Sequence, residues 1–144
     1  MLQKFPAPAF TVTTKLTFTP RFPGDQTGLV VLGRSCSALA VQNSAQGLVI
    51  KQLIRQHADH EGVGSESAAI PVQGGTFYLR AVVDRQAMVH FFYSLDGTKF
   101  YPVGTPFQAV AGEWIGAKAG LFAMGTATQG ELGYADYDWF RFEP

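Results

Sequence analysis

Apolar and polar residues alternate with a period of two along much of this sequence, a pattern typical of β-strands that bury one face. Residues 10–19 show the alternation most clearly, because polar residues, mostly threonines, separate the apolar side chains Phe10, Val12, Leu16 and Phe18. Pro20 then ends the segment. We predict a half-buried strand over 10–19, with most of its threonines and Lys15 on the outer face.

Further short strands are expected at intervals, separated by turns that contain glycine or proline. They span residues 28–33, 37–42, 76–84, 86–94 and 134–142. Residues 47–56 also match helical spacing, but this run is short and rich in β-branched residues, so we predict a strand there. Residues 57–71 are polar and carry several glycines or prolines, so we expect a loop.

The dipeptide Asp96-Gly97 lies between two segments that carry aromatic residues, and such a dipeptide is a strong hairpin signal. It predicts that a strand beginning at Phe100 pairs with the strand that ends at Ser94. Residues 114–123 are apolar with a glycine at every fourth position, which indicates a close approach of the backbone to a neighbouring segment.

These observations together predict the fold class. The chain has 144 residues, of which 47% are apolar and 15% charged, so it can bury one sizeable core and is expected to form one domain. Ten or so short strands, 16 glycines, 8 prolines and no capped helix predict an all-β sandwich. A jelly roll is favoured over a barrel, because several strands are apolar on both faces.

Charge and cysteine content argue against several classes of protein. Eleven basic residues balance eleven acidic ones without a basic run, so no nucleic-acid partner is expected. No apolar run approaches the roughly 18 residues of a membrane span, so no membrane partner is expected either. We expect a soluble chain, either cytoplasmic of bacterial type or exported with a parent protein. The single cysteine, Cys36, excludes an internal disulfide, and we expect a buried, inert thiol.

The motifs of phosphate transfer and acyl transfer are absent, so the chain alone is not expected to be an enzyme. Asp136 and Asp138 share one face of a predicted strand, roughly 7 Å apart. Carboxylate pairs cleave glycosides, but they normally face each other across a cleft from separate elements. Two other interpretations stay open: a structural calcium site completed by loop carbonyls, or hydrogen bonds to the backbone or to an arginine such as Arg80 or Arg141.

Two further groups of polar residues have several interpretations. Two histidines and two acids within residues 57–61 match no zinc-binding pattern, so a solvated loop is favoured over a metal site: His57, Asp59, His60 and Glu61. On the predicted strand 86–94, His90 shares a face with Met88 and Phe92. This face either packs into the structure or, if it meets solvent, binds sugar rings, because aromatic side chains stack on their C–H faces.

Four segments of the second half resemble one known family. They are Phe-Tyr-Leu-Arg-Ala-Val-Val-Asp at 77–84, Phe-Tyr-Ser-Leu-Asp-Gly at 92–97, Gly-Glu-Trp-Ile-Gly-Ala-Lys-Ala-Gly-Leu-Phe at 112–122 and Ala-Asp-Tyr-Asp-Trp-Phe-Arg-Phe at 135–142. In this order they are similar to the C-terminal β-sandwich of family 43 glycoside hydrolases of the β-xylosidase and α-arabinofuranosidase type. Residues 14–20 and 24–31 resemble that domain's early strands, so the resemblance covers roughly 10–143.

The resemblance implies a concanavalin A-like jelly-roll sandwich of two antiparallel sheets, with residues 1–144 forming one domain that lacks the family's first strands. It also implies a non-catalytic accessory domain of an enzyme that acts on xylan or arabinan side chains. Its partners would be a catalytic propeller domain and plant cell-wall oligosaccharides. The alternative is an independent carbohydrate-binding module.

The same resemblance suggests site residues. In β-xylosidases an aromatic side chain from a loop of this domain helps to close the substrate pocket, and by position Trp114 or Phe122 would match it. In a binding module, His90 and Phe92 would contact the sugar. No catalytic residue is implied in this chain, and no cofactor is expected apart from calcium bound by Asp136 and Asp138.

Overall fold

The computed structural model describes residues 2–4, 9–32, 36–55, 64–67, 69–108, 118–124 and 134–143. These residues form twelve strands and no helix. The strands are β1 (Leu2–Lys4), β2 (Phe10–Thr19), β3 (Gln26–Leu32), β4 (Cys36–Ser44), β5 (Gly47–Arg55), β6 (Gly64–Glu66), β7 (Ile70–Pro71), β8 (Thr76–Val83), β9 (Met88–Ser94), β10 (Tyr101–Gln108), β11 (Lys118–Met124) and β12 (Tyr134–Glu143). Because no helix is present in this part of the chain, none there is long and apolar enough to cross a membrane.

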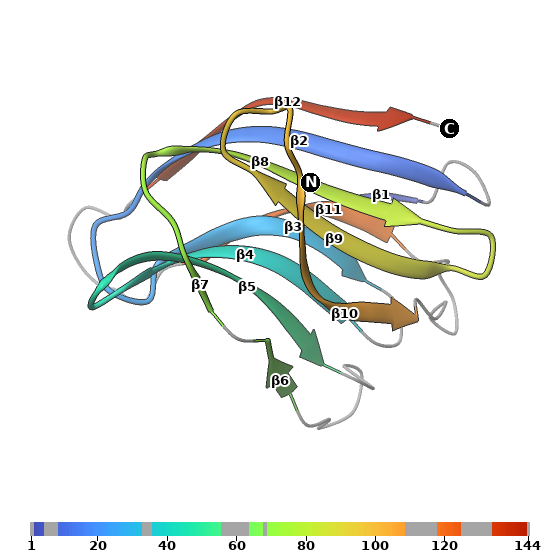
Figure 1. Ribbon diagram of the computed structural model, residues 1–144, viewed down its shortest axis with the longest axis horizontal. Coiled ribbons are helices and arrows are strands. Elements are labelled where there is room, and N and C mark those ends of the chain that lie inside the picture. Colours follow the sequence, from blue (N-terminus) through green and yellow to red (C-terminus); the bar gives the residue numbers. More distant parts are fainter. Residues whose placement is uncertain are drawn as a thin grey trace.

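The strands form two antiparallel sheets, which confirms the predicted sandwich (Figure 1). One sheet has the order β1-β11-β3-β4-β5-β6, with β7 also paired to β5, and the other has the order β10-β9-β8-β2-β12. Strands β2 and β12 are neighbours although they lie at opposite ends of the sequence. Such long-range pairing is typical of a jelly roll rather than of consecutive hairpins.

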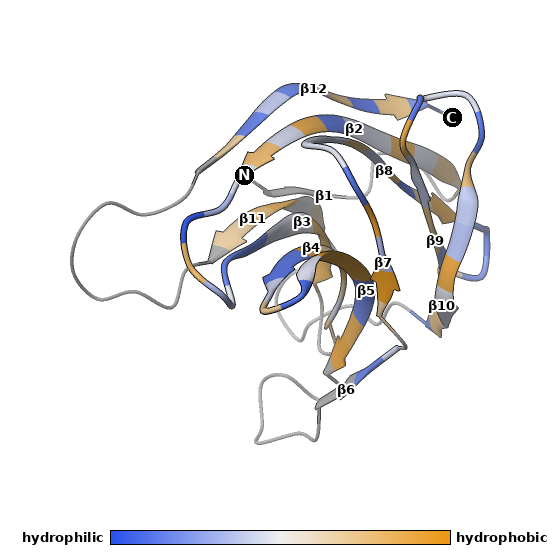
Figure 2. Cartoon of the chain, turned by 60° about the vertical axis from the view of Figure 1, so that its left-hand side comes forward, coloured by the Kyte–Doolittle hydropathy of each residue, from blue (hydrophilic) through white to orange (hydrophobic). Residues whose placement is uncertain are grey.

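The core lies between the inner faces of the two sheets, where alternate residues of each strand are buried. Strand β2 follows the prediction, since Phe10, Val12, Leu16 and Phe18 point inward. Its bounds also agree with the predicted ones. Alternation of hydrophobic and hydrophilic residues is visible along β2 and β12 in Figure 2. The hydrophobic effect therefore fixes which face of each strand is buried.

Strand β12 departs from the simple alternation that its sequence suggests. Its register with β2 shifts between Tyr137 and Trp139, so that Asp138 is an extra residue in a β-bulge. Asp136 and Asp138 share one face, as predicted, and this is the outer face, but beyond the bulge the faces exchange. Phe140 then points into the core, whereas Trp139 lies on the outer face opposite Lys15. A strict alternation over 134–142 would put Trp139 on the same face as Tyr137, and the bulge reverses this.

Several predicted boundaries also need correction. The predicted loop at 57–71 contains the short strands β6 and β7, and residues 57–61 lie outside the described part of the chain. Residues 47–55 form a strand, as expected. The thiol of Cys36 is half-buried rather than buried.

The turn between β8 and β9 is wider than the single residue predicted. The Asp84 carboxylate accepts hydrogen bonds from the amides of Gln86 and Met88, both at 2.9 Å. Ala87 adopts a positive φ of 61°, which closes this turn at the cost of backbone strain. Asp84 therefore belongs to the turn, and not to the strand predicted over 76–84.

One edge of the sandwich is tied by Gln52 of β5, which is 1% exposed. Its amide accepts a hydrogen bond from the Thr105 amide at 2.8 Å and donates one to the Thr105 carbonyl at 2.9 Å. Gly104 approaches so closely that a Cβ on it would lie 1.9 Å from Gln52 Oε1. Gln52 therefore holds β10 of one sheet against β5 of the other.

The opposite edge is tied by Tyr137 of β12. Its hydroxyl hydrogen-bonds with Thr27 Oγ1 and donates toward the carbonyls of Gly28 and Phe122 at 3.3 and 3.2 Å. Thr27 Oγ1 itself donates to the Phe122 carbonyl at 2.8 Å. Burial raises the pKa of the Tyr137 phenol, since desolvation disfavours the anion.

Candidate functional site

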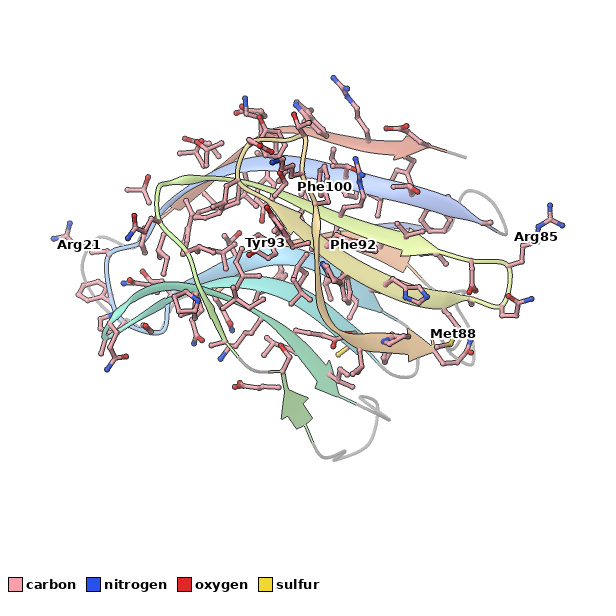
Figure 3. The ribbon with its side chains drawn as sticks, in the orientation of Figure 1. Arg21, Arg85, Met88, Phe92, Tyr93 and Phe100 are labelled. Atoms are coloured by element: carbon pink, nitrogen blue, oxygen red, sulfur yellow. The ribbon has the colours of Figure 1, made fainter. Side chains whose placement is uncertain are left out.

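The outer face of the five-stranded sheet holds two of the predicted site residues. His90 and Phe92 lie on β9 with their side chains on this face, as does Met88, and all three are half-buried. Figure 3 shows Met88 near one end of β9 and Phe92 near its middle. The expected row of these side chains on one sheet face is therefore present.

Cross-strand pairing adds residues to this face that the sequence analysis did not assign to a site. Phe92 pairs with Arg80 of β8, Arg80 with Thr13 of β2, and Thr13 with Arg141 of β12. In this row, Thr13 therefore lies between Arg80 and Arg141. The four strands come from three separate parts of the sequence, so no short motif could have revealed the row.

Three of the aromatic rings on this face are already covered by other groups of the chain. The Arg80 guanidinium lies 3.8 Å from the centroid of Phe100, and that of Arg141 lies 4.4 Å from the centroid of Trp139. Gly97 packs so closely on Tyr78 that a Cβ there would lie 2.9 Å from the ring. Phe92 makes no ring contact among the described residues.

The connection between β9 and β10 crosses this face, in front of β8 in Figure 1. Its sequence predicted a hairpin, and β9 and β10 do pair, but β10 begins at Tyr101 rather than Phe100. The Asp96 carboxylate accepts hydrogen bonds from the amides of Thr98 and Lys99 at 2.8 and 2.9 Å. The Lys99 and Thr98 amides lower the pKa of this carboxyl. Asp96 therefore shapes a longer loop that carries Phe100 onto Arg80.

The two aspartates of β12 lie on the same outer face but not in a cleft between elements. Asp136 is exposed and pairs with Thr17, and Asp138 lies 3.5 Å from Lys15 Nζ. Among the described residues, no three His, Cys, Asp or Glu side chains gather where they could hold a metal ion. In the structure, Asp138 therefore forms an ion pair with Lys15.

The remaining predicted site residues lie elsewhere. Phe122 is half-buried on β11, which pairs with β3 in the other sheet, and its side chain is on the outer face of that sheet. It therefore does not join His90 and Phe92 in one site. Trp114 lies outside the described residues, in the connection between β10 and β11.

Comparison with known protein families identifies one family. The model of the Beta xylosidase C-terminal Concanavalin A-like domain, GH43_C2, matches residues 1–143. A search of curated proteins finds no match.

Solved structures that are similar to this chain include the following three. The GH43 protein BlXynB of Bacillus licheniformis is 23% identical, with a TM-score of 0.81 over 99% of this chain and 29% of that one. The xylan β-1,4-xylosidase of Bacillus halodurans is 18% identical, with a TM-score of 0.83 over 99% and 29%. A bifunctional GH43-CE protein of Bacteroides eggerthii is 24% identical, with a TM-score of 0.81 over 99% and 19%.

At these identities the likeness shows a shared fold, and this chain spans less than a third of the length of each of the three proteins. The concanavalin A-like fold expected from the resemblance is confirmed.

Proposed function

Because the chain belongs to the family of β-xylosidase C-terminal concanavalin A-like domains, we propose that it is the accessory domain of a glycoside hydrolase that acts on xylan or arabinan side chains. It packs on a catalytic propeller domain and completes that domain's substrate pocket. The observation that carries this proposal is the match over residues 1–143, together with the small share of each solved enzyme that the chain covers.

The placement of acidic side chains supports a non-catalytic role. Glycoside hydrolysis needs two carboxyl groups on either side of the scissile bond. Asp136 and Asp138 instead follow one another on the outer face of β12, and Asp138 is engaged by Lys15. The catalytic carboxylates therefore belong to the partner domain.

The proposed role of Trp114 is supported by its position in the element order. It follows β10 of the five-stranded sheet and precedes β11 of the seven-stranded sheet. The connection between these two strands therefore joins the two sheets. Gln52 anchors β10 on one side of this connection, and an unbroken pairing with β3 anchors β11 on the other. We propose Trp114 as the residue that closes the pocket.

A chimera tests this proposal. The C-terminal domain of the Bacillus halodurans xylosidase is replaced by residues 1–144, and hydrolysis of a nitrophenyl xyloside is measured. We expect an active chimera, in which Trp114→Ala lowers kcat/KM at least about tenfold, since a lost pocket wall lets water and misaligned substrate enter. Gln46→Ala, in the exposed β4–β5 turn at the opposite end of the strands, serves as the control and should leave kcat/KM unchanged.

The outcomes separate the two parts of the proposal. A folded chimera without activity, judged by circular dichroism and gel filtration, would contradict the docking role. An active chimera whose kcat/KM is unchanged by Trp114→Ala would contradict only the pocket role.

An independent carbohydrate-binding module is the second candidate, and it is favoured by Phe92, which is half-buried on the outer face and makes no ring contact among the described residues. A sugar ring needs an uncovered aromatic face. On this sheet, Tyr78, Phe100 and Trp139 are covered by other groups of the chain, which leaves fewer stacking positions than a module for neutral sugars would be expected to show. We therefore place the accessory role first.

A further inference from the structure

Two arginines lie on either side of Thr13 on the outer face of the five-stranded sheet. Arg80 of β8 and Arg141 of β12 each pair with Thr13 of β2, so that their backbones are about 10 Å apart. Thr13 is only 4% exposed although it lies on an outer face. Arg80 Nε donates a hydrogen bond to Thr13 Oγ1 at 3.0 Å. The Arg80 side chain therefore lies along the sheet, toward the strand that neighbours Arg141.

Both guanidinium groups are held by stacking rather than by ion pairs. Arg80 lies over Phe100 and Arg141 over Trp139. Within the described part of the chain, neither arginine has a carboxylate within ion-pair distance. Stacking occupies a face of the planar guanidinium and leaves N–H groups on its edge, which suit a carboxylate or phosphate in bidentate geometry. The two arginines are thus oriented donors whose charge is not neutralised by a neighbouring carboxylate.

The groups beside the arginines favour a sugar acid as their ligand. Phe92 pairs with Arg80 in the same row, and its half-buried ring makes no ring contact among the described residues. An aromatic face next to a guanidinium edge matches a pyranose ring that carries a carboxylate. The acids of β12 on this face lie to either side of the row. Asp136 and Asp138 precede Arg141, with Asp138 engaged by Lys15, and Glu143 stands two residues beyond Arg141. The row itself is therefore positively charged.

We propose that this row binds a uronic acid residue of an acidic xylan. Arg80 and Arg141 hold the carboxylate, and Phe92 supports the sugar ring. The two arginines support recognition of a carboxylate. The choice of a glycan rather than an acidic protein surface as the ligand rests on the proposed function. The site would hold the parent enzyme at regions of the xylan that carry uronic acid residues.

Calorimetric titration of the full chain at low ionic strength tests this proposal. One probe is a xylo-oligosaccharide with a single glucuronic acid branch, and the other is the neutral xylo-oligosaccharide of the same length. We expect the acidic probe to bind about tenfold more tightly or better, as hydrogen bonds to a charged group imply. Rising salt should weaken this binding, since the Arg141 side chain is exposed to solvent.

Substitutions locate the site. Arg141→Gln is decisive, because this side chain is exposed and its loss should not unfold the chain; we expect about a tenfold loss for the acidic probe. Arg141→Lys should recover only part of that loss, because lysine lacks the bidentate fork. Glu143→Gln should strengthen binding by removing a nearby negative charge. Arg85→Gln is the matched control, since Arg85 lies at the far tip of the β8–β9 hairpin in Figure 3 and should have no effect.

Several results would overturn the proposal. They are equal affinity for the two probes, no measurable binding, or an equal loss from Arg85→Gln. Binding of a glutamate-rich peptide through the same arginines, without binding of the sugar acid, would assign the row to a protein partner instead. The chimera assay uses a neutral substrate, so the two proposals can fail separately. An active chimera that does not bind the sugar acid would reject only the arginine site. An inactive chimera that binds the sugar acid would reject only the docking role.

Discussion

The two edges of this sandwich are each tied by one polar side chain, and the two ties differ in what they bind. At the edge between β5 and β10, the Gln52 amide hydrogen-bonds both the N–H and the C=O of Thr105. At the edge between β12 and β11, the Tyr137 hydroxyl joins Thr27, which already donates to the Phe122 carbonyl. The Gln52 tie replaces missing backbone hydrogen bonds, whereas the Tyr137 tie adds to hydrogen bonds that are already present.

The difference follows from the regularity of the neighbouring strands. The register between β9 and β10 shifts between Val103 and Phe107, which leaves Thr105 without a partner in the ladder. The pairing of β11 with β3 instead runs without a break over seven residues. A buried polar side chain is therefore essential where a bulge exposes backbone groups, and supplementary where the ladder is intact. Along the sequence, Trp114 follows β10, the strand that the Gln52 tie holds.

Gly104→Ala should break the Gln52 tie and produce the largest effect. Gly104 has a φ of +71°, and an added Cβ would meet the Gln52 amide oxygen at 1.9 Å. Backbone strain and loss of the paired hydrogen bonds together should lower the free energy of unfolding by about 4 kcal/mol, as measured by urea titration. Gly75→Ala is the control, because its nearest contact would be 3.8 Å away. Wild-type stability for Gly104→Ala would show that the edge repacks easily.

Gln52→Leu should have the next largest effect, because it fills the same space without the amide. The N–H and C=O of Thr105 then lose their side-chain partner, and because Thr105 is exposed, water replaces part of the loss, so we expect a cost of about 2 kcal/mol in the free energy of unfolding. Hydrogen exchange should locate this loss, with the Thr105 amide deprotected more than those of β9. The control is Gln42→Leu, a half-buried glutamine on β4 whose side chain makes no hydrogen bond within the described part of the chain. Equal losses from both substitutions would contradict a specific tie.

Much of the fold could be predicted from the sequence, because burial repeats with period two along regular strands. The bounds and buried face of β2 are as predicted. The alternation fails in β12 at Asp138, because one inserted residue reverses every later side chain and no residue type marks a bulge reliably. For the same reason, the outward orientation of Trp139 could not be predicted from the sequence.

The candidate site was less predictable than the fold. His90 and Phe92 could be assigned to one strand face by their spacing alone. The arginine row could not, because register between β2, β8 and β12 decides which residues become neighbours. Phe122 failed to join the site for a related reason: the sequence does not state which sheet a strand belongs to.

Tyr137→Phe should have the smallest effect, and its pH dependence sharpens the contrast between the two ties. The substitution removes one hydroxyl while Thr27 keeps its hydrogen bond to the Phe122 carbonyl, so we expect a loss of about 1 kcal/mol at neutral pH. Burial raises the pKa of the Tyr137 phenol in the folded state. The contribution is therefore complete below the phenol's ordinary pKa and is lost as pH rises through the folded-state pKa, because the unfolded chain ionises first. Urea titrations at rising pH should show a steeper decline for the wild type than for Tyr137→Phe, with Tyr101→Phe, an exposed tyrosine, following the wild type. Parallel declines in all three proteins would mean that the Tyr137 hydroxyl is not held in a desolvated site, and the second tie would then be no more than packing.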